Sequence, residues 1–100
     1  MIIDKTALFD EWLKRLPDIR AKERIVARIR RMEILESIPG DIKPVGKGVY
    51  EMRFHFGPGY RVYFTIHNDE TLVLPAGGDK STQKRDITQA RRLKEGLTRR

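Results

Sequence analysis

The sequence predicts an α+β domain in which two N-terminal helices pack on a small antiparallel β-sheet and a C-terminal helix follows. Three observations support this fold class. Apolar residues recur at helical spacing over about the first 37 residues, alternate with polar residues between 49 and 74, and return to helical spacing from about 81 to 97. The chain has 100 residues. Because that length suits one domain, we expect a single domain over residues 1–100.

Two amphipathic helices are predicted in the first third of the chain. The first covers Thr6–Leu16, is capped by its first residue and is ended by Pro17. Asp18 can cap a second helix over about Ile19–Ser37. A turn is expected at residues 38–41, where a proline and a glycine follow one another. The apolar stripes consist of Leu8, Phe9, Trp12, Leu13 and Leu16 in the first helix, and of Ile25, Ile29, Met32 and Leu35 in the second.

Three strands are predicted in the middle of the chain. Residues 49–56 and 60–67 alternate with period two, and the Gly-Pro-Gly stretch at 57–59 reads as a hairpin loop between them. A third, short strand is expected at 71–74, stopped by Pro75. One face of the hairpin is expected to point toward the helices through Tyr50, Met52, Phe54, Val62, Phe64 and Ile66.

The last helix is predicted after a glycine-rich loop at 76–80. Ser81 or Thr82 can cap it, and it ends at about Leu97. The resulting order of elements favours helices that all lie on one face of the sheet. The inner stripe of this helix is expected to consist of Ile87, Ala90, Leu93 and Leu97.

The composition restricts the classes of function. Lys and Arg number 21 against 14 Asp and Glu, so the net charge is +7, which favours nucleic acids, acidic proteins or acidic membranes as partners. The absence of cysteine excludes disulfides, Cys-ligated zinc, iron–sulfur clusters and a thiol nucleophile. No apolar run approaches the roughly 18 residues of a membrane span, and no signal-peptide pattern opens the sequence. We therefore expect a cytoplasmic protein that does not contact a membrane.

The basic residues concentrate in two of the predicted helices. Within the second helix, Arg20, Arg24, Arg28 and Arg31 follow one another at helical spacing and form one stripe. Such a stripe can be a solvated helix face. It can also contact RNA phosphates or an acidic partner, and the second basic helix at 80–100 favours this alternative.

The other face of the hairpin carries polar residues that could perform chemistry. If the loop has three residues, His55 lies opposite Arg61, Arg53 opposite Tyr63 and Glu51 opposite Thr65. Cleavage of RNA by its own 2′-hydroxyl needs a base, fixed positive charge at the phosphate and an acid for the leaving 5′-oxygen. Arginines suit the phosphate, and histidine can move the proton. Solubilising surface residues would give the same pattern.

We expect this face to form an RNA-cleaving site. Lys80 can reach it from the glycine-rich loop, where the start of the last helix also favours an anion. No group of His, Asp or Glu residues has the spacing of metal ligands, so neither a metal nor a cofactor is expected. The candidate catalytic residues are Arg53, His55, Arg61 and Lys80. The candidate substrate-binding residues are Lys43, Lys47, Tyr63, which could stack on a base, and Gln83.

Two stretches of this region resemble a known family. They are YEMRFHFGPGYRVYF at 50–64 and LPAGGDKSTQ at 74–83, followed by Asp86-Ile87. They resemble the phage-derived HigB-like "addiction module killer" toxins of the RelE/ParE superfamily, and the resemblance extends over nearly the whole chain. It implies a compact α+β toxin of a type II toxin–antitoxin pair. By position, Arg61, Arg53 and Lys80 match the phosphate-handling residues of that superfamily.

The resemblance also implies an activity and partners. Members typically cleave mRNA on the translating ribosome by a metal-independent ribonuclease mechanism. A HigA-like helix-turn-helix antitoxin, encoded beside the toxin, neutralises it and represses the operon. The toxin is thus expected to reach operator DNA only through the antitoxin.

The sequence departs from the family pattern in two places. RelE-type toxins use a C-terminal tyrosine, whereas no tyrosine follows Tyr63 here, and Glu51 stands where RelE has a basic residue. Two alternatives to RNA cleavage follow. One is a ParE-like toxin that poisons DNA gyrase, because fold alone does not separate the two branches. The other is an inactive homologue that still binds the antitoxin.

Overall fold

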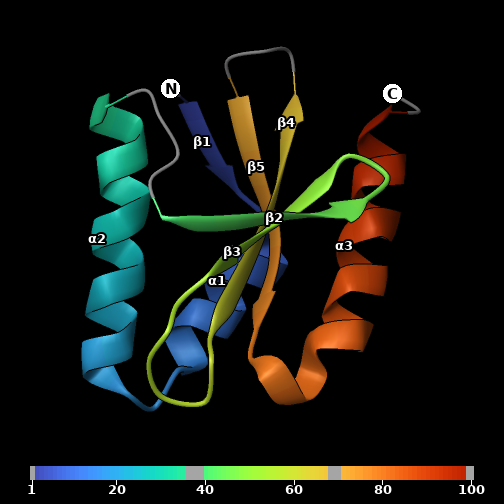
Figure 1. The fold of residues 1–100 in the computed structure, drawn as a ribbon. Coiled ribbons are helices and arrows are strands. Elements are labelled where there is room, and N and C mark those ends of the chain that lie inside the picture. The colour runs from blue at the N-terminus through green and yellow to red at the C-terminus, as the bar shows by residue number, and fades with distance from the viewer. Residues whose placement is uncertain (1, 36–39, 68–70, 99–100) are drawn as a thin grey trace.

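The computed structural model describes residues 2–35, 40–67 and 71–98 and places a five-stranded sheet between helices (Figure 1). The strand order across the sheet is β1-β5-β4-β3-β2. The strands are β1 (Ile2–Lys5), β2 (Asp41–Gly46), β3 (Val49–Arg53), β4 (Arg61–His67) and β5 (Thr71–Gly78). The helices are α1 (Ala7–Arg15), α2 (Ile19–Leu35), the short 3₁₀ helix η1 (Lys80–Thr82) and α3 (Gln83–Thr98). None of the described helices is long and apolar enough to cross a membrane.

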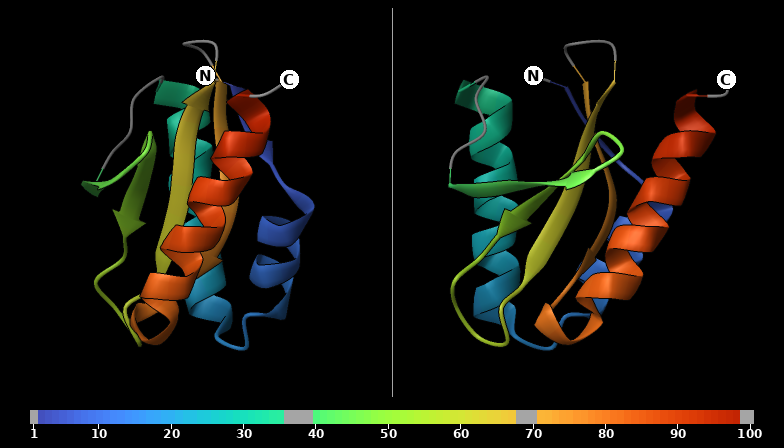
Figure 2. Two further views of the ribbon diagram at one scale, coloured as in Figure 1. Left: turned by 90° about the vertical axis from the view of Figure 1, so that its right-hand side faces the viewer. Right: turned by 45° about the vertical axis from the view of Figure 1, so that its right-hand side comes forward.

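The predicted α+β class is confirmed, but the helices lie on both faces of the sheet. Helices α1 and α2 cover one face and α3 crosses the other (Figure 2). The prediction that all helices share one face was wrong, because the second face of the hairpin is also buried, beneath α3. Val49 and Tyr63 are buried there against Ala90.

The sequence did not predict the two outer strands. β1 is only four residues long and pairs in parallel with β5. β2 contains Pro44 and ends at Gly46. Proline is unfavourable inside a sheet but is tolerated in an edge strand, and β2 is an edge strand. Asp41, expected in a turn, is the first residue of β2. Residues 38 and 39 of the predicted turn lie outside the described residues. The predicted end of the second helix at Ser37 also lies outside them.

β5 continues through Pro75 to Gly78, although proline was expected to end it. The pairing of β4 with β5 shifts register at this point, from Tyr63 with Ala76 to Thr65 with Val73. Pairing with β1 ends at Leu74. Neither ladder therefore needs the N–H that proline lacks.

The hairpin pairs two residues away from the predicted register. Arg53 lies opposite Arg61, and Glu51 opposite Tyr63, so the expected partners of His55 and Thr65 were wrong. The loop is longer than three residues, because the chain leaves β3 after Arg53 and re-enters β4 at Arg61. Since the shift is an even number of residues, each side chain keeps its predicted face.

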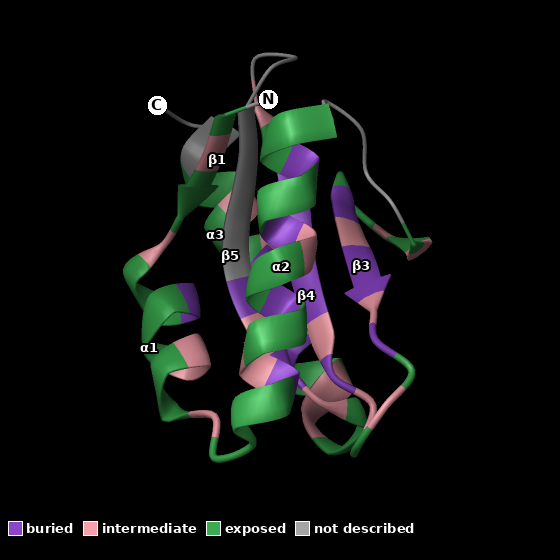
Figure 3. Cartoon of the chain, turned by 90° about the vertical axis from the view of Figure 1, so that its left-hand side faces the viewer, coloured by how far each residue is buried: buried purple, intermediate pink, exposed green. Residues whose placement is uncertain are grey.

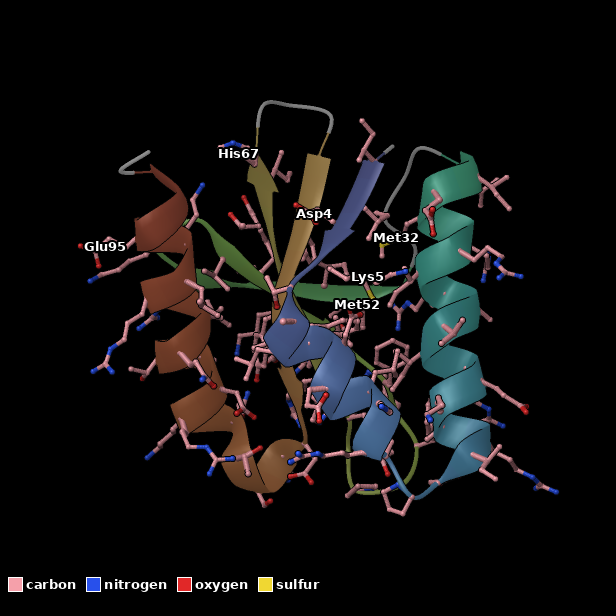
Figure 4. All side chains as sticks on the ribbon, turned by 180° about the vertical axis from the view of Figure 1, so that it is seen from behind. Asp4, Lys5, Met32, Met52, His67 and Glu95 are labelled. Carbon is pink, nitrogen blue, oxygen red and sulfur yellow. The ribbon has the colours of Figure 1, made fainter. Side chains whose placement is uncertain are left out.

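The main core lies between α1, α2 and the sheet (Figure 3). Met32 of α2 and Met52 of β3, both labelled in Figure 4, are fully buried in it. Ile66 and Leu93, expected to point inward, are instead 41% and 37% exposed. The remaining buried members are Phe9, Ala21, Ile25, Ile29, Phe54, Tyr60, Val62 and Phe64.

The first two predicted caps are confirmed and the third was wrong. The Thr6 hydroxyl accepts from the Phe9 N–H, and the Asp18 carboxylate accepts from the Ala21 N–H. At the start of the last helical segment, Asp79 is the cap and accepts from the N–H and hydroxyl of Ser81. The segment thus already carries a carboxylate at its start, where an anion from the substrate was expected.

Candidate active site

A hollow of about 490 Å³ lies at the lower end of the β3–β4 hairpin in Figure 1. It brings together all four candidate catalytic residues, which come from three separate parts of the chain. β3 and the loop after it supply Arg53 and His55, β4 supplies Arg61, and η1 supplies Lys80. The other lining residues belong to the loop: Phe54, Phe56, Gly57, Pro58, Gly59 and Tyr60.

The loop is held in shape by its own backbone. The Phe54 N–H donates to the Tyr60 carbonyl, and the Gly59 N–H donates to the Phe56 carbonyl. Gly57 and Gly59 have φ values of 56° and 78°, which favour glycine. A side chain at Gly59 would come within 3.3 Å of Nη1 of Arg61, so glycine keeps this part of the hollow open.

Arg61 is mostly buried, and its guanidinium is held from two sides. Nη1 donates to the Gly59 carbonyl at 2.7 Å, and Nε lies 3.5 Å from Oε2 of Glu51. Its side chain is only 11% exposed. An arginine held in this way keeps one orientation and can present its remaining N–H groups to a phosphate in the hollow.

Glu51 is a fully buried carboxylate beneath α3. Oε2 accepts hydrogen bonds from the Tyr63 hydroxyl at 3.2 Å and from Nε2 of Gln83 at 2.9 Å. Burial, and then the neighbouring Glu51 charge, raise the pKa of Tyr63. The expectation that Tyr63 stacks on an RNA base was wrong, because its ring has no exposed surface. The amide N–H of Gln83 is likewise directed to Glu51 rather than outward.

Arg53 and His55 share one carboxylate that the sequence did not point to. Oδ2 of Asp41 lies 3.1 Å from Nε of Arg53 and 2.6 Å from Nε2 of His55. The hydrogen bond from His55, and then that from Arg53, hold the pKa of Asp41 below its usual value. The signal in the sequence would have been an edge strand, since Asp41 is the Cα partner of Arg53 in β2.

Lys80 is exposed at the rim of the hollow, whereas the other candidate lysines lie elsewhere. Lys43 is exposed on β2 opposite Glu51, and Lys47 is exposed in the turn between β2 and β3. This turn is at the opposite end of β3 from the hollow. His67 is at the far end of β4 from Arg61 (Figure 4), outside the hollow.

The basic stripe of α2 is partly committed to packing. The guanidinium groups of Arg24 and Arg28 lie over the rings of Phe56 and Phe54, at 4.8 and 4.7 Å from the ring centroids. Nη1 of Arg28 also donates to the Arg53 carbonyl at 2.9 Å, and burial lowers the pKa of Arg28. These two residues hold α2 against the loop of the hollow. Arg20 and Arg31 of the stripe are exposed.

The hollow is lined by three basic residues, Arg53, Arg61 and Lys80, together with one histidine, His55. A site of this kind can bind a phosphodiester, stabilise added negative charge on it and exchange a proton with it. Within the described ranges, no three His, Cys, Asp or Glu side chains come together as a possible metal site.

Comparison with known proteins places the chain in a family. The model of the family described as "Phage derived protein Gp49-like (DUF891)" matches residues 11–95. The chain belongs to this Gp49-like family. An uncharacterized protein of Haemophilus influenzae is 46% identical over 95 residues, which cover 95% of this chain and 94% of the relative.

The Gp49-like family is a RelE/HigB-like toxin family associated with toxin–antitoxin systems. Membership therefore implies an antitoxin partner. The family match spans every residue that lines the hollow, so the candidate site lies inside the part of the chain that defines the family.

Proposed function

We propose that this chain is a HigB-like toxin that cleaves mRNA on the translating ribosome in the cytoplasm by a metal-independent mechanism. The observation that carries the proposal is the hollow that Arg53, Arg61, Lys80 and His55 line together. In this proposal His55 serves both as the base and as the acid, and the three basic residues supply the fixed positive charge at the phosphate.

His55 moves the proton in the proposed reaction. Its Nε2 is bound to Asp41, so Nδ1 is the nitrogen that accepts the 2′-hydroxyl proton. The 2′-oxygen attacks phosphorus and the bond to the 5′-oxygen breaks. The products are a 2′,3′-cyclic phosphate and a 5′-hydroxyl, to which the proton is returned.

Arg53 and Arg61 stabilise the negative charge that develops on the phosphate in the transition state. Arg61 suits this role because its guanidinium is fixed by Gly59 and Glu51 before the substrate arrives. Lys80 holds the RNA backbone at the rim. Lys43, Lys47 and the exposed arginines of α2 bind ribosomal or messenger RNA further away, which makes binding sensitive to salt.

The proposed antitoxin is a HigA-like helix-turn-helix protein encoded beside the toxin. Acidic residues on the antitoxin would cover the basic hollow and block access of RNA. Operator DNA is contacted by the antitoxin, and the toxin reaches it only as part of the complex.

The test is inducible expression without the antitoxin, followed by sequencing of RNA 5′-hydroxyl ends. Lys80→Ala and His55→Ala are the informative variants, because both side chains are exposed and their loss leaves the core intact. Lys84→Ala is the matched control, since Lys84 is exposed one helical turn from Lys80 and does not line the hollow. We expect new 5′-hydroxyl ends within translated mRNA for the native chain and for Lys84→Ala, and few for the other two.

Two outcomes would contradict the proposal. Growth arrest with altered DNA supercoiling and no new RNA ends would identify a gyrase poison. Absence of arrest, with the antitoxin still captured by the purified chain, would identify an inactive homologue.

A further inference from the structure

We propose that Asp41 is a positioning residue that fixes both His55 and Arg53 for RNA cleavage. The inference rests on the proposed function. It adds a residue of β2, a strand from which no described residue lines the hollow. Asp41 does not line the hollow itself, so it acts only through the two side chains it binds.

The geometry of the three residues carries this inference. Asp41 and Arg53 are Cα partners across β2 and β3, so their side chains emerge on the same face of the sheet. One oxygen, Oδ2 of Asp41, accepts from Nε of Arg53 at 3.1 Å and from Nε2 of His55 at 2.6 Å. His55 follows the strand in a loop and is 72% exposed, so few other contacts restrain its ring.

The carboxylate also selects the tautomer of His55. An ionised carboxylate only accepts hydrogen bonds, so the proton of a neutral imidazole bound to it is on Nε2. Nδ1 then has the free lone pair and serves as the base. Without Asp41, an exposed histidine would exchange between rotamers and between tautomers, and a smaller fraction of molecules would hold the base in place.

Arg53 is oriented by the same oxygen. Because Nε is bound to Asp41, the two terminal nitrogens of the guanidinium remain to bind a phosphate, each donating a hydrogen bond to one of its oxygens. The carboxylate thus orients the guanidinium of Arg53 and the imidazole of His55 at once.

The test measures kcat and KM for cleavage of ribosome-bound mRNA by the full-length chain. Asp41→Asn is the main variant, because both contacts meet the single oxygen Oδ2. If the amide oxygen of Asn takes that position, it offers only a neutral and weaker acceptor, and if the amide nitrogen takes it, neither Arg53 nor an Nε2–H of His55 has an acceptor there. We expect kcat to fall about 10–100-fold with KM changed by less than about 3-fold. Asp10→Asn, an exposed substitution on α1, is the control and is expected to keep native kinetics.

A double variant separates positioning from a general effect on structure. The part of the effect that acts through His55 is already lost in His55→Ala, so adding Asp41→Asn is expected to slow His55→Ala by a smaller factor than it slows the native chain, and the remaining loss acts through Arg53. Equal fold-losses in the two backgrounds, or native kcat in Asp41→Asn, would overturn the inference. Absence of cleavage by the native chain would instead contradict the proposed function, so the two failures are distinguishable.

Discussion

The carboxylate of Glu51, which has no exposed surface, lies 3.5 Å from Nε of Arg61. Arg61 is the link between this buried charge and the hollow. Because the carboxylate also holds Tyr63 and Gln83, the first turn of α3, the centre of the sheet and the proposed phosphate-binding arginine form one connected polar network.

Substitution of Arg61 is expected to lower the free energy of unfolding by more than substitution of Glu51. Arg61→Ala leaves the Glu51 charge buried without a counter-ion, so we expect the free energy of unfolding to fall by about 3–5 kcal/mol. Glu51→Gln is expected to cost less, since Arg61 still reaches the Gly59 carbonyl. Urea unfolding measures both. If the buried charge of Glu51 causes the loss, the double variant Glu51→Gln/Arg61→Ala is more stable than Arg61→Ala. Equal stability of the two variants would contradict this cause.

Two adjacent glycines allow the helices to approach β5 from opposite faces. A Cβ at Gly77 would lie 2.3 Å from the ring of Trp12, and one at Gly78 would lie 1.8 Å from Oδ2 of Asp86. We expect Gly77→Ala and Gly78→Ala each to lower the free energy of unfolding by about 1–3 kcal/mol or more.

Gly96 is the matched control for these glycines. A Cβ at this position of α3 would meet nothing within 4 Å. Gly96→Ala is therefore expected to stabilise the protein by roughly 0.5–1 kcal/mol, because alanine has the higher helix propensity. Equal thermal shifts for the three substitutions would show that steric contact at β5 is not the cause.

Arg28 is expected to matter for structure and Arg20 is not. Arg28 lies over Phe54 and donates to the Arg53 carbonyl, so Arg28→Ala is expected to cost about 1–2 kcal/mol. Arg20 is exposed on the same helix, and Arg20→Ala is expected to change stability by no more than about 0.5 kcal/mol. Thermal unfolding compares the two. Similar melting temperatures would indicate that the loop does not depend on α2.

The pairing of Asp41 predicts an acid-sensitive contact. Its folded pKa is below its usual value, so the contribution to stability is present above about pH 4 and is lost as the pH falls through that lower pKa. His55→Ala removes the largest cause of the shift and is expected to raise the titration midpoint of Asp41. Carboxyl chemical shifts followed by NMR give this midpoint, and an unchanged value would exclude the hydrogen bond in solution.

Local patterns in the sequence were enough for the helices and the hairpin. The caps at Thr6 and Asp18 were predicted because a capping side chain acts within three residues of itself. The faces of most hairpin residues, though not of Ile66, were also predicted, since alternation fixes faces even when the register shifts by two. For this reason Arg53, His55 and Arg61 were assigned to one face of the hairpin, and Lys80 was added because the glycine-rich loop could bring it there.

Only the tertiary structure decided which groups those residues meet. Asp41 reaches His55 because β2 pairs at the edge of the sheet, and an edge strand with Pro44 carries little local signal. Tyr63 and Glu51 are buried because α3 crosses a face that period-two alternation labels only as polar. Periodicity reports on neighbours along the chain, whereas burial and hydrogen bonding depend on elements far away in sequence. The sequence by itself thus identified most residues of the candidate site, and packing determined which of them line the hollow and which are buried or bound to one another.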